Sequence, residues 1–229
     1  MEVAQRVLSG YGQSGVTDHA TGGACIPEFL LQYEESDWVF LRRLASHFGT
    51  YLLADATDAC GKVYFGIPEI SYGTVLDRQD YTMEKDMLHY ARVLEKEGVL
   101  SQEASCWNVM VRFFLRMGET LTFNGIEAVV TAMRLHTEKG ELVYSYVLAR
   151  RAGIRREKEK NPGIFGMSIP ATVMERSGNR IRVHFEIDPE YEASEKTKYF
   201  TYAIESSSFY CMPEEGSQVH IYFLSLIHI

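Results

Sequence analysis

The stretch that decides the fold runs from Ile26 to Asp55 and reads IPEFLLQYEESDWVFLRRLASHFGTYLLAD. Ser36 can accept a hydrogen bond from a free backbone N–H group and Asp37 places a carboxylate in the first turn, so we expect a helix to begin here. Gly49 supplies its C-terminal stop. The spacing predicts one apolar face, with two arginines turned largely away from it: Leu41, Leu44, Ala45 and Phe48, preceded by Trp38, against Arg42 and Arg43.

Short apolar runs flank this helix on both sides. Residues 29–33 are typical of a strand before it, and residues 51–54 and 62–66 predict two strands after it, joined by a turn rich in Asp, Thr and Gly. We therefore expect a unit made of a strand, a helix and a hairpin.

The sequence of this stretch, QYEESDWVFLRRL, resembles a signature of the VgrG, phage late-control-D and tail-hub proteins of contractile injection systems. Those proteins carry Q-Y-x-E-S/T-D-W/L-x-F-L-x-R-L in such a segment. A match at that many defined positions is far more specific than a lone glycine motif. The matching positions are Gln32, Tyr33, Glu35, Ser36, Asp37, Phe40, Leu41, Arg43 and Leu44.

Composition limits the classes of function. A chain of 229 residues with 46% hydrophobic content can build one large or two small domains, and its net charge of −8 argues against a general attraction to nucleic acid or anionic membranes. The N-terminus lacks the features of a signal peptide, and no apolar run approaches the roughly 18 residues of a membrane span, so we expect cytoplasmic folding. Isolated cysteines predict reduced thiols rather than a zinc site: Cys25, Cys60, Cys106 and Cys211.

The first residues predict a short helix over 2–9 that ends at Gly10, because Val3, Val7 and Leu8 recur at helical spacing. The following segment, residues 10–15, fits G-x-G-x-x-G, but a dinucleotide-binding fingerprint needs a strand before it and a helix after it. We interpret this segment as a connector.

The middle of the chain changes from helical to alternating periodicity. Residues 69–81 are rich in turn formers, and residues 86–99 predict a helix or, as an alternative, a pair of strands. Residues 106–115 predict a strand, and Asn124-Gly125 and Lys139-Gly140 each predict a hairpin turn. Four antiparallel strands in a row predict a small barrel or a curled sheet.

A polar segment, residues 150–163, has no apolar face and ends in Asn-Pro-Gly. Its arginines and lysines could form a phosphate-binding run, but Glu157 and Glu159 interrupt them and favour a solvated linker. We therefore predict a first domain over residues 1–150, a linker over 151–163 and a second domain over 164–229.

The second domain is predicted to be all β. Residues 169–175 and 180–185 predict strands around a tight turn, with Ile181, Val183 and Phe185 on one face of the second. After an acidic loop, residues 199–205 and 218–223 predict two more strands, which fits an OB-like Greek-key barrel.

The end of the chain, FYCMPEEGSQVHIYF, resembles the OB-fold of the same spike family, G-x-x-F-x-P-E-x-G-D-E-V-x-V-x-F. Ser217 stands where the family usually has Asp, and Glu186 replaces the usual Pro after the second strand. The matching positions are Phe209, Pro213, Glu214, Gly216 and Val219.

Together the two resemblances imply a mainly β fold with helices (α+β), in which a tail-hub-like barrel domain with inserted helices precedes an OB-fold-like β-barrel. They imply a structural hub and spike base that forms a homotrimer, joins tail-tube and baseplate proteins, and carries a spike-tip protein or effector. We expect a fragment that lacks the first hub barrel and the needle, with an apolar tail, residues 224–229, that need not be native; a compact paralogue is the alternative.

Catalytic and cofactor signals are weak throughout the sequence. Glu34 and Glu35 are adjacent, so they cannot face one cleft as a glycosidase pair, and the seven histidines form no H-x-x-x-H pair. We predict no enzymatic activity, no cofactor and no metal site. Two alternatives stay open: an OB-fold that binds single-stranded nucleic acid, and the hub of a lytic tail protein whose enzyme domain lies elsewhere.

Overall fold

The computed structural model describes residues 1–12, 15–26, 28–55, 57, 61–77, 80–188, 197–203 and 211–224. The chain forms two compact units, and neither is continuous in sequence. The first unit comprises Met1–Ile26 and Glu35–Glu159, and the second comprises Pro27–Glu34 and Lys160–Ile229. The division between the units therefore falls elsewhere than the sequence predicted.

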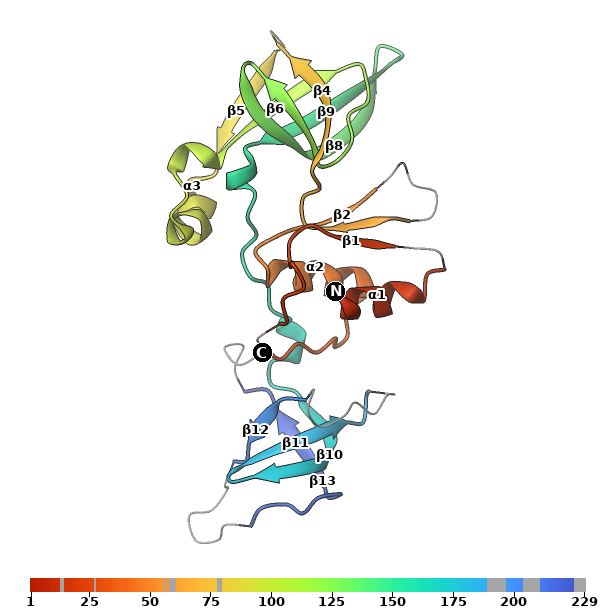
Figure 1. Ribbon diagram of the computed structural model, residues 1–229, viewed down its shortest axis with the longest axis vertical. Coiled ribbons are helices and arrows are strands. Elements are labelled where there is room, and N and C mark those ends of the chain that lie inside the picture. Colours follow the sequence, from red (N-terminus) through yellow and green to blue (C-terminus); the bar gives the residue numbers. More distant parts are fainter. Residues whose placement is uncertain are drawn as a thin grey trace. The chain divides into compact units, whose positions relative to one another are not determined.

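The first unit begins with two helices and a three-stranded sheet. In Figure 1, α1 (Glu2–Ser9) and α2 (Asp37–Ser46) lie on one side of the sheet β1-β3-β2. The strands β2 (Leu52–Ala54) and β3 (Val63–Phe65) form the predicted hairpin, and β1 (Val16–Asp18) pairs parallel to β3.

One strand was predicted in the wrong place. Residues 29–33 form no strand, and the partner of the hairpin is instead β1, which has three residues inside a Thr/Gly-rich loop. A strand that short carries too little alternation for its sequence to predict it. The predicted helix before it, α1, is confirmed and precedes the G-x-G-x-x-G segment, which is the reverse of the order that a dinucleotide site needs.

The larger sheet of the first unit has six strands in the order β4-β7-β8-β9-β6-β5. All neighbours are antiparallel except β4 and β7. The six strands are β4 (Ile70–Leu76), β5 (Tyr81–Lys85), β6 (Ser105–Val111), β7 (Glu119–Phe123), β8 (Ile126–Glu138) and β9 (Glu141–Ala149).

Both predicted hairpin turns are confirmed, with φ of +46° and +77° at Asn124-Gly125 and of +49° and +85° at Lys139-Gly140. The segment 69–81, predicted to be rich in turns, instead contains β4 and ends at the first residue of β5, so that prediction was wrong for β4. These two strands form the edges of the sheet, and within the described ranges no ladder joins them, so the sheet is curled but not closed.

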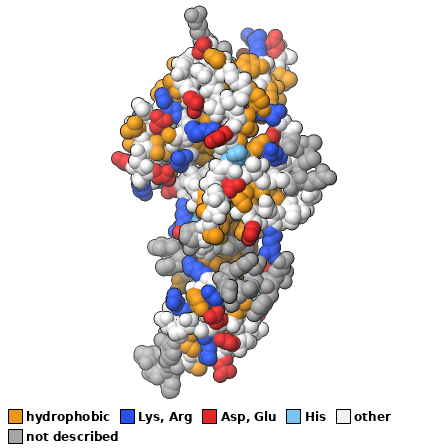
Figure 2. Space-filling view, in the orientation of Figure 1, with side chains coloured by type: hydrophobic (Ala, Val, Ile, Leu, Met, Phe, Trp, Pro, Cys, Tyr) orange, Lys and Arg blue, Asp and Glu red, His pale blue; other side chains and the backbone are white. Residues whose placement is uncertain are grey.

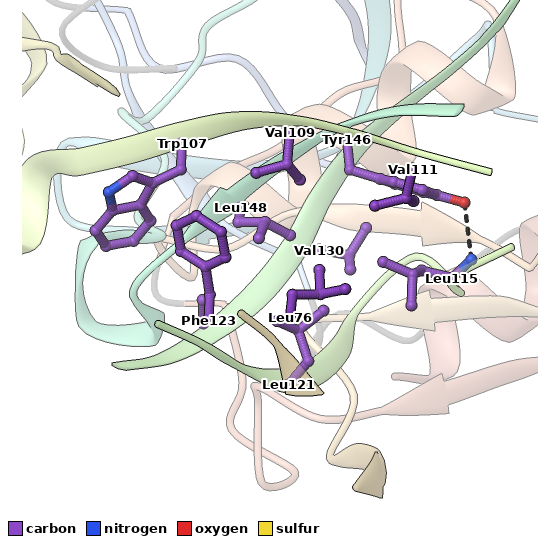
Figure 3. Close-up of a cluster of buried hydrophobic side chains, with 11 residues drawn as sticks. Leu76, Trp107, Val109, Val111, Leu115, Leu121, Phe123, Val130, Tyr146 and Leu148 are labelled. Atoms are coloured by element: carbon purple, nitrogen blue, oxygen red, sulfur yellow. Dashed lines mark hydrogen bonds between the residues drawn. The ribbon is translucent and has the colours of Figure 1, made fainter. Parts of the chain in front are cut away.

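A single apolar core fills the concave side of this sheet (Figure 3). Tyr146 is buried there and its hydroxyl accepts a hydrogen bond of 2.7 Å from the backbone N–H of Leu115. Tyr81 of the edge strand β5 contacts Phe123 edge-on, with ring centroids 5.2 Å apart, which shows how far the sheet curls.

Between β5 and β6 the chain is helical, as predicted for residues 86–99, but the helix changes type. A short α-helical turn α3 (Met87–His89) continues as a π-helix (Tyr90–Leu94) and two 3₁₀ turns (Glu95–Glu97 and Ser101–Ala104). After β9, a 3₁₀ turn (Arg151–Gly153) leads into residues 154–159.

The segment predicted to be a solvated linker is packed against the first unit as far as Glu159. Ile154 is buried, and the Arg151 guanidinium donates to the backbone carbonyls of Ile67 and Pro68 and to the hydroxyl of Thr120. The prediction of a solvated linker was therefore wrong as far as Glu159, because a buried isoleucine and a bridging arginine hold this part of the segment.

The second unit is an antiparallel sheet in the order β12-β11-β10-β13. Its strands are β10 (Ser168–Ser177), β11 (Arg180–Phe185), β12 (Tyr199–Thr201) and β13 (Gln218–Tyr222), preceded by a 3₁₀ turn (Pro162–Ile164). The predicted alternation on β11 is confirmed, since its apolar residues are buried and Arg182 and His184 are not.

The OB-like barrel predicted for this unit is not seen, because the four described strands form an open sheet. The core of this sheet also receives a segment from much earlier in the chain. Phe29, Leu31 and Tyr33 pack against it, and Phe29 lies 5.2 Å from Phe200 and 5.7 Å from Phe185 between ring centroids.

As a whole the fold is mainly β with a few helices, as predicted. Of the helices that the structure describes, none has both the length and the apolar character needed to cross a membrane.

Candidate functional site

The helix at the centre of the sequence motif begins and ends as predicted. The Ser36 hydroxyl accepts from the backbone N–H of Val39 at 3.4 Å. At the other end, the N–H of Thr50 donates to Ala45 and that of Gly49 donates to Ser46, with Gly49 at φ +64°. These two bonds form a Schellman motif, so a left-handed glycine ends the helix.

Inside the helix, Arg43 forms a buried ion pair with Glu35. The two side chains are only 3% and 8% exposed, and Arg43 binds both carboxylate oxygens, with 3.3 Å from its Nε to Oε2. Its guanidinium also lies 5.4 Å from the centroid of the Phe40 ring. Both residues of the pair are motif positions, so the motif contains a desolvated, bidentate charge pair.

The orientation predicted for two side chains of this helix was wrong. Arg43 faces inward, because the segment that ends at Glu159 covers that side of the helix: the backbone N–H of Glu159 donates to the Ser46 hydroxyl at 2.9 Å. Trp38, predicted on the buried face, is 40% exposed. Helical periodicity shows one apolar face, and it gave no sign that a second segment packs on the other.

Asp37, the next motif position, connects the first turn of α2 to the loop after α1. Its carboxylate accepts a hydrogen bond of 2.6 Å from the Tyr11 hydroxyl, and this bond and the negative charge raise the pKa of Tyr11. The remaining apolar motif residues, Phe40, Leu41 and Leu44, are buried.

The motif is divided between the two units. Gln32 and Tyr33 belong to the second unit, whereas the positions from Glu35 to Leu44 belong to the first. The Tyr33 carbonyl accepts a hydrogen bond of 2.6 Å from the buried Asn161 side chain. Between the two halves, Glu34 adopts φ +45°, which is uncommon for a residue other than glycine.

The second motif forms the turn that leads into β13. Phe209 lies outside the described residues, whereas Pro213, Glu214 and Gly216 lie inside them. Gly216, at φ +86°, donates its backbone N–H to Val173 at 2.8 Å, and Val173 donates to Ser217 at 2.9 Å. Val173 lies at a bulge of β10, so this turn joins the bulge to the last strand.

A further polar arrangement, formed by Asp18 and Thr21, was not predicted from the sequence. Burial raises the pKa of Asp18, but hydrogen bonds from the Thr21 hydroxyl and from the backbone N–H groups of Thr21 and Ala20 outweigh it and lower the pKa to about 2. The spacing Asp-x-x-Thr in a glycine-rich loop was the available signal.

Among the described residues around the two motifs no arrangement for catalysis is visible, and no group of three or more described His, Cys, Asp and Glu side chains could hold a metal ion. The residues that the motifs bring together are engaged in caps, a buried ion pair and turns. What they provide is a fixed geometry of helix, sheet and chain crossing.

Comparison with known proteins gives the class of the fold first. No protein-family model and no curated protein match the sequence. Solved structures do match, and a secretion-system component and a tail protein are among them. The fold is therefore tail-like, similar to that of a type VI secretion component that itself resembles phage tail proteins.

One structure with a substantial match is the E. coli c3393 protein, described as a component of the type VI secretion system with structural similarity to the T4 bacteriophage tail proteins gp27 and gp5. The match has a TM-score of 0.62 at 14% identity and covers 96% of this chain. This chain spans 66% of that structure's length. A tail protein from Neisseria meningitidis MC58 also matches, with a TM-score of 0.44, 12% identity and 67% of this chain covered.

Proposed function

We propose that this chain is a hub and spike-base component of a contractile, phage-tail-like injection machine or type VI-like secretion system, of the VgrG and late-control-D type. The observation that carries the proposal is the likeness in fold to the c3393 protein over 96% of the chain. The motif supports it independently, because its polar positions are used to fix structure: Ser36 caps a helix, and Glu35 and Arg43 pair inside the first unit.

In this role the chain is an adaptor, not an enzyme. Three copies join tail-tube and baseplate proteins on one side and a membrane-piercing spike, a spike-tip protein or an effector on the other. The chain is made in the cytoplasm, is assembled into the particle there, and is delivered outward on contraction. The buried charge pair and the Schellman end of α2 suit a part that must keep its shape under load.

An assembly experiment tests this proposal directly. The chain, in its natural gene context and with an affinity tag, is expressed together with the tube and sheath genes of the same genome, and particles are purified by sedimentation. We expect the tag in the particle fraction and antibody label at one end of the tube in negative-stain images. Assembled particles that never contain the tag would overturn the proposal.

An OB-fold that binds single-stranded nucleic acid receives less support. Residues 161–229 contain five Lys and Arg against nine Asp and Glu, a net charge of −4, and in Figure 2 acidic and basic side chains are interspersed on the face shown. The arginines of β11 are also engaged: Arg180 and Arg182 lie over the Tyr199 ring, and Arg182 binds Glu175 at 2.9 Å.

Two measurements address the alternatives. Titration with a labelled oligonucleotide at low salt should show no micromolar binding. Binding that weakens steeply with salt would instead favour a protein that binds single-stranded nucleic acid. Incubation of the purified chain with cell-wall preparations should release no muropeptides, and release would favour a lytic tail protein.

A further inference from the structure

A cavity of about 300 Å³ lies inside the first unit and takes no part in the proposed assembly role. Its walls come from the residues around β2, from α3, and from the segments that begin β6 and follow β9. Small residues leave the space open, among them Ala104, Ser105 and Ala149. The volume is roughly ten times that of one water molecule and lies at the lower end of the range for small-ligand pockets.

One side of the cavity is formed by backbone and not by side chains. Gly153 lies so close to the preceding 3₁₀ turn that a Cβ atom added to it would be 1.8 Å from the carbonyl oxygen of Glu103. Two backbone segments therefore meet there and close one side. Most of the remaining wall is apolar, with Leu53, Ile67 and Ile154 as its largest aliphatic side chains.

Beside His89 and several hydroxyl groups, the polar part of the wall contains two carboxylates. Asp86 and Glu103 line the cavity, and the described residues that line it include no lysine or arginine. Glu103 has a cationic partner, Arg150, at 3.6 Å. Asp86 is exposed and accepts a hydrogen bond of 2.8 Å from the backbone N–H of His89, so it caps α3 and keeps its carboxylate at the edge of the cavity.

The charge of Asp86 acts on groups across the cavity. Burial raises the pKa of the Cys106 thiol, and the nearby carboxylates of Glu84 and Asp86 raise it further. Burial also raises the pKa of Tyr51; there the Arg156 cation opposes the effect, while Glu159 and Asp86 add to it. Arg156 itself is paired with Glu159. A carboxylate at the edge of a mostly apolar cavity favours a cation that carries an apolar body.

We propose that this cavity binds a short apolar amine, with its hydrocarbon part against Leu53, Ile67 and Ile154 and its ammonium group at Asp86. The same chemistry is presented by a free alkylamine and by a lysine side chain of another protein. The inference does not depend on the hub role, so either can fail while the other stands.

Isoleucine-methyl NMR on the full chain tests the proposal. The δ1-methyl groups of Ile67 and Ile154 lie at the cavity, whereas those of Ile164 and Ile169 lie in the second unit and serve as internal references. Hexylammonium should shift the first pair and leave the second unchanged, with a Kd on the order of 1 mM for a ligand of this size. Hexanoate and hexanol are the matched probes of opposite and zero charge.

Two variants and one control sharpen the result. Asp86→Asn keeps a good helix cap but removes the charge, and should weaken hexylammonium binding at least about fivefold. Ala149→Leu fills the cavity and should abolish the shifts. Ala132→Leu, at an exposed position of β8, should change neither the affinity for hexylammonium nor the methyl shifts that it causes.

The outcomes separate cleanly. Preferential binding of hexylammonium with loss in both variants supports the proposal. Equal binding of hexanol, unchanged affinity in Asp86→Asn, or no shift at 20 mM ligand, which is about 20-fold above the expected Kd, would each overturn it. A short peptide, acetyl-Leu-Lys-Leu-amide, identifies the source: tighter binding than hexylammonium indicates a protein side chain, and binding of the free amine alone indicates a small molecule.

Discussion

At the scale of single residues, the charged side chains that matter for stability are those that the fold places next to an oppositely charged partner. Glu35 and Arg43 are eight positions apart and meet because Glu35 precedes the helix and Arg43 faces back into the first unit. Removing one of these residues leaves the other charge buried and unpaired, which lowers the free energy of unfolding. Replacing both with apolar residues leaves no unpaired buried charge.

We predict that Arg43→Ala lowers the free energy of unfolding of the first unit by about 3–5 kcal/mol. The double change Glu35→Leu with Arg43→Met should recover most of this loss, since it leaves no unpaired buried charge. Both tryptophans, Trp38 and Trp107, lie in the first unit, so urea unfolding followed by tryptophan fluorescence reports on this unit alone. A loss below about 1 kcal/mol in Arg43→Ala would contradict the burial of the pair.

A second prediction concerns Asp18, whose pKa is lowered to about 2 from an ordinary value of 3.8. Because the folded state favours the ionised form, the stabilisation is complete above pH 4 and is lost as the pH falls toward 2. Asp18→Asn should cost about 1–2 kcal/mol at pH 7 and almost nothing at pH 2. Urea unfolding at pH 2, 3, 4 and 7 measures this, and a cost that does not vary with pH would contradict it.

At the scale of elements, turn and cap chemistry decides where helices and strands end. Gly10 and Gly49 both follow helices, but only Gly49 is in the left-handed region, at φ +64°, whereas Gly10 has φ −69°. A side chain is therefore strained at Gly49 and tolerated without strain at Gly10.

Gly49→Ala is therefore predicted to lower the free energy of unfolding by about 1 kcal/mol, because alanine has to adopt the left-handed conformation of the Schellman motif. Gly10→Ala is the matched control, since an added Cβ there would lie 3.8 Å from the nearest atom, the Val7 carbonyl oxygen. It should be neutral or slightly stabilising. Tryptophan fluorescence in urea compares the two, and equal effects would show that the backbone conformation of Gly49 is not limiting.

Local chemistry also explains which elements could be predicted from the sequence. The cap at Ser36 and the turns at Asn124-Gly125 and Lys139-Gly140 depend on two to four adjacent residues, and all were placed correctly. Strand β1 has only three residues, and β5 is a five-residue edge strand whose residues are all exposed, so neither carries a strong local signal. The inward turn of Arg43 depends on Glu159, more than a hundred residues away.

At the scale of the whole molecule, each unit draws on distant parts of the chain. The core of the second unit combines β10, β11 and β13 with Phe29, Leu31 and Tyr33. Phe29 contacts Phe185, Phe200 and Phe223, so an early aromatic ring completes a late core.

We predict that Phe29→Ala in the full chain destabilises the second unit by about 2–3 kcal/mol and leaves the first unaffected. Hydrogen exchange should show faster exchange of the β10, β11 and β13 amides and unchanged exchange in α2. Phe165→Ala is the control, because this phenylalanine of the same unit is 58% exposed. Equal effects of the two changes would show that Phe29 is not part of that core.

The division of the second unit also has a consequence for synthesis. A ribosome makes the segment 27–34 first and does not reach Lys160 until about 125 residues later. At about 5–20 residues per second, the apolar side chains of this segment wait on the order of 10 s for the strands that cover them. During that interval the nascent chain carries an uncovered aromatic segment, and a binder of exposed hydrophobic peptides has its best opportunity to capture the protein then.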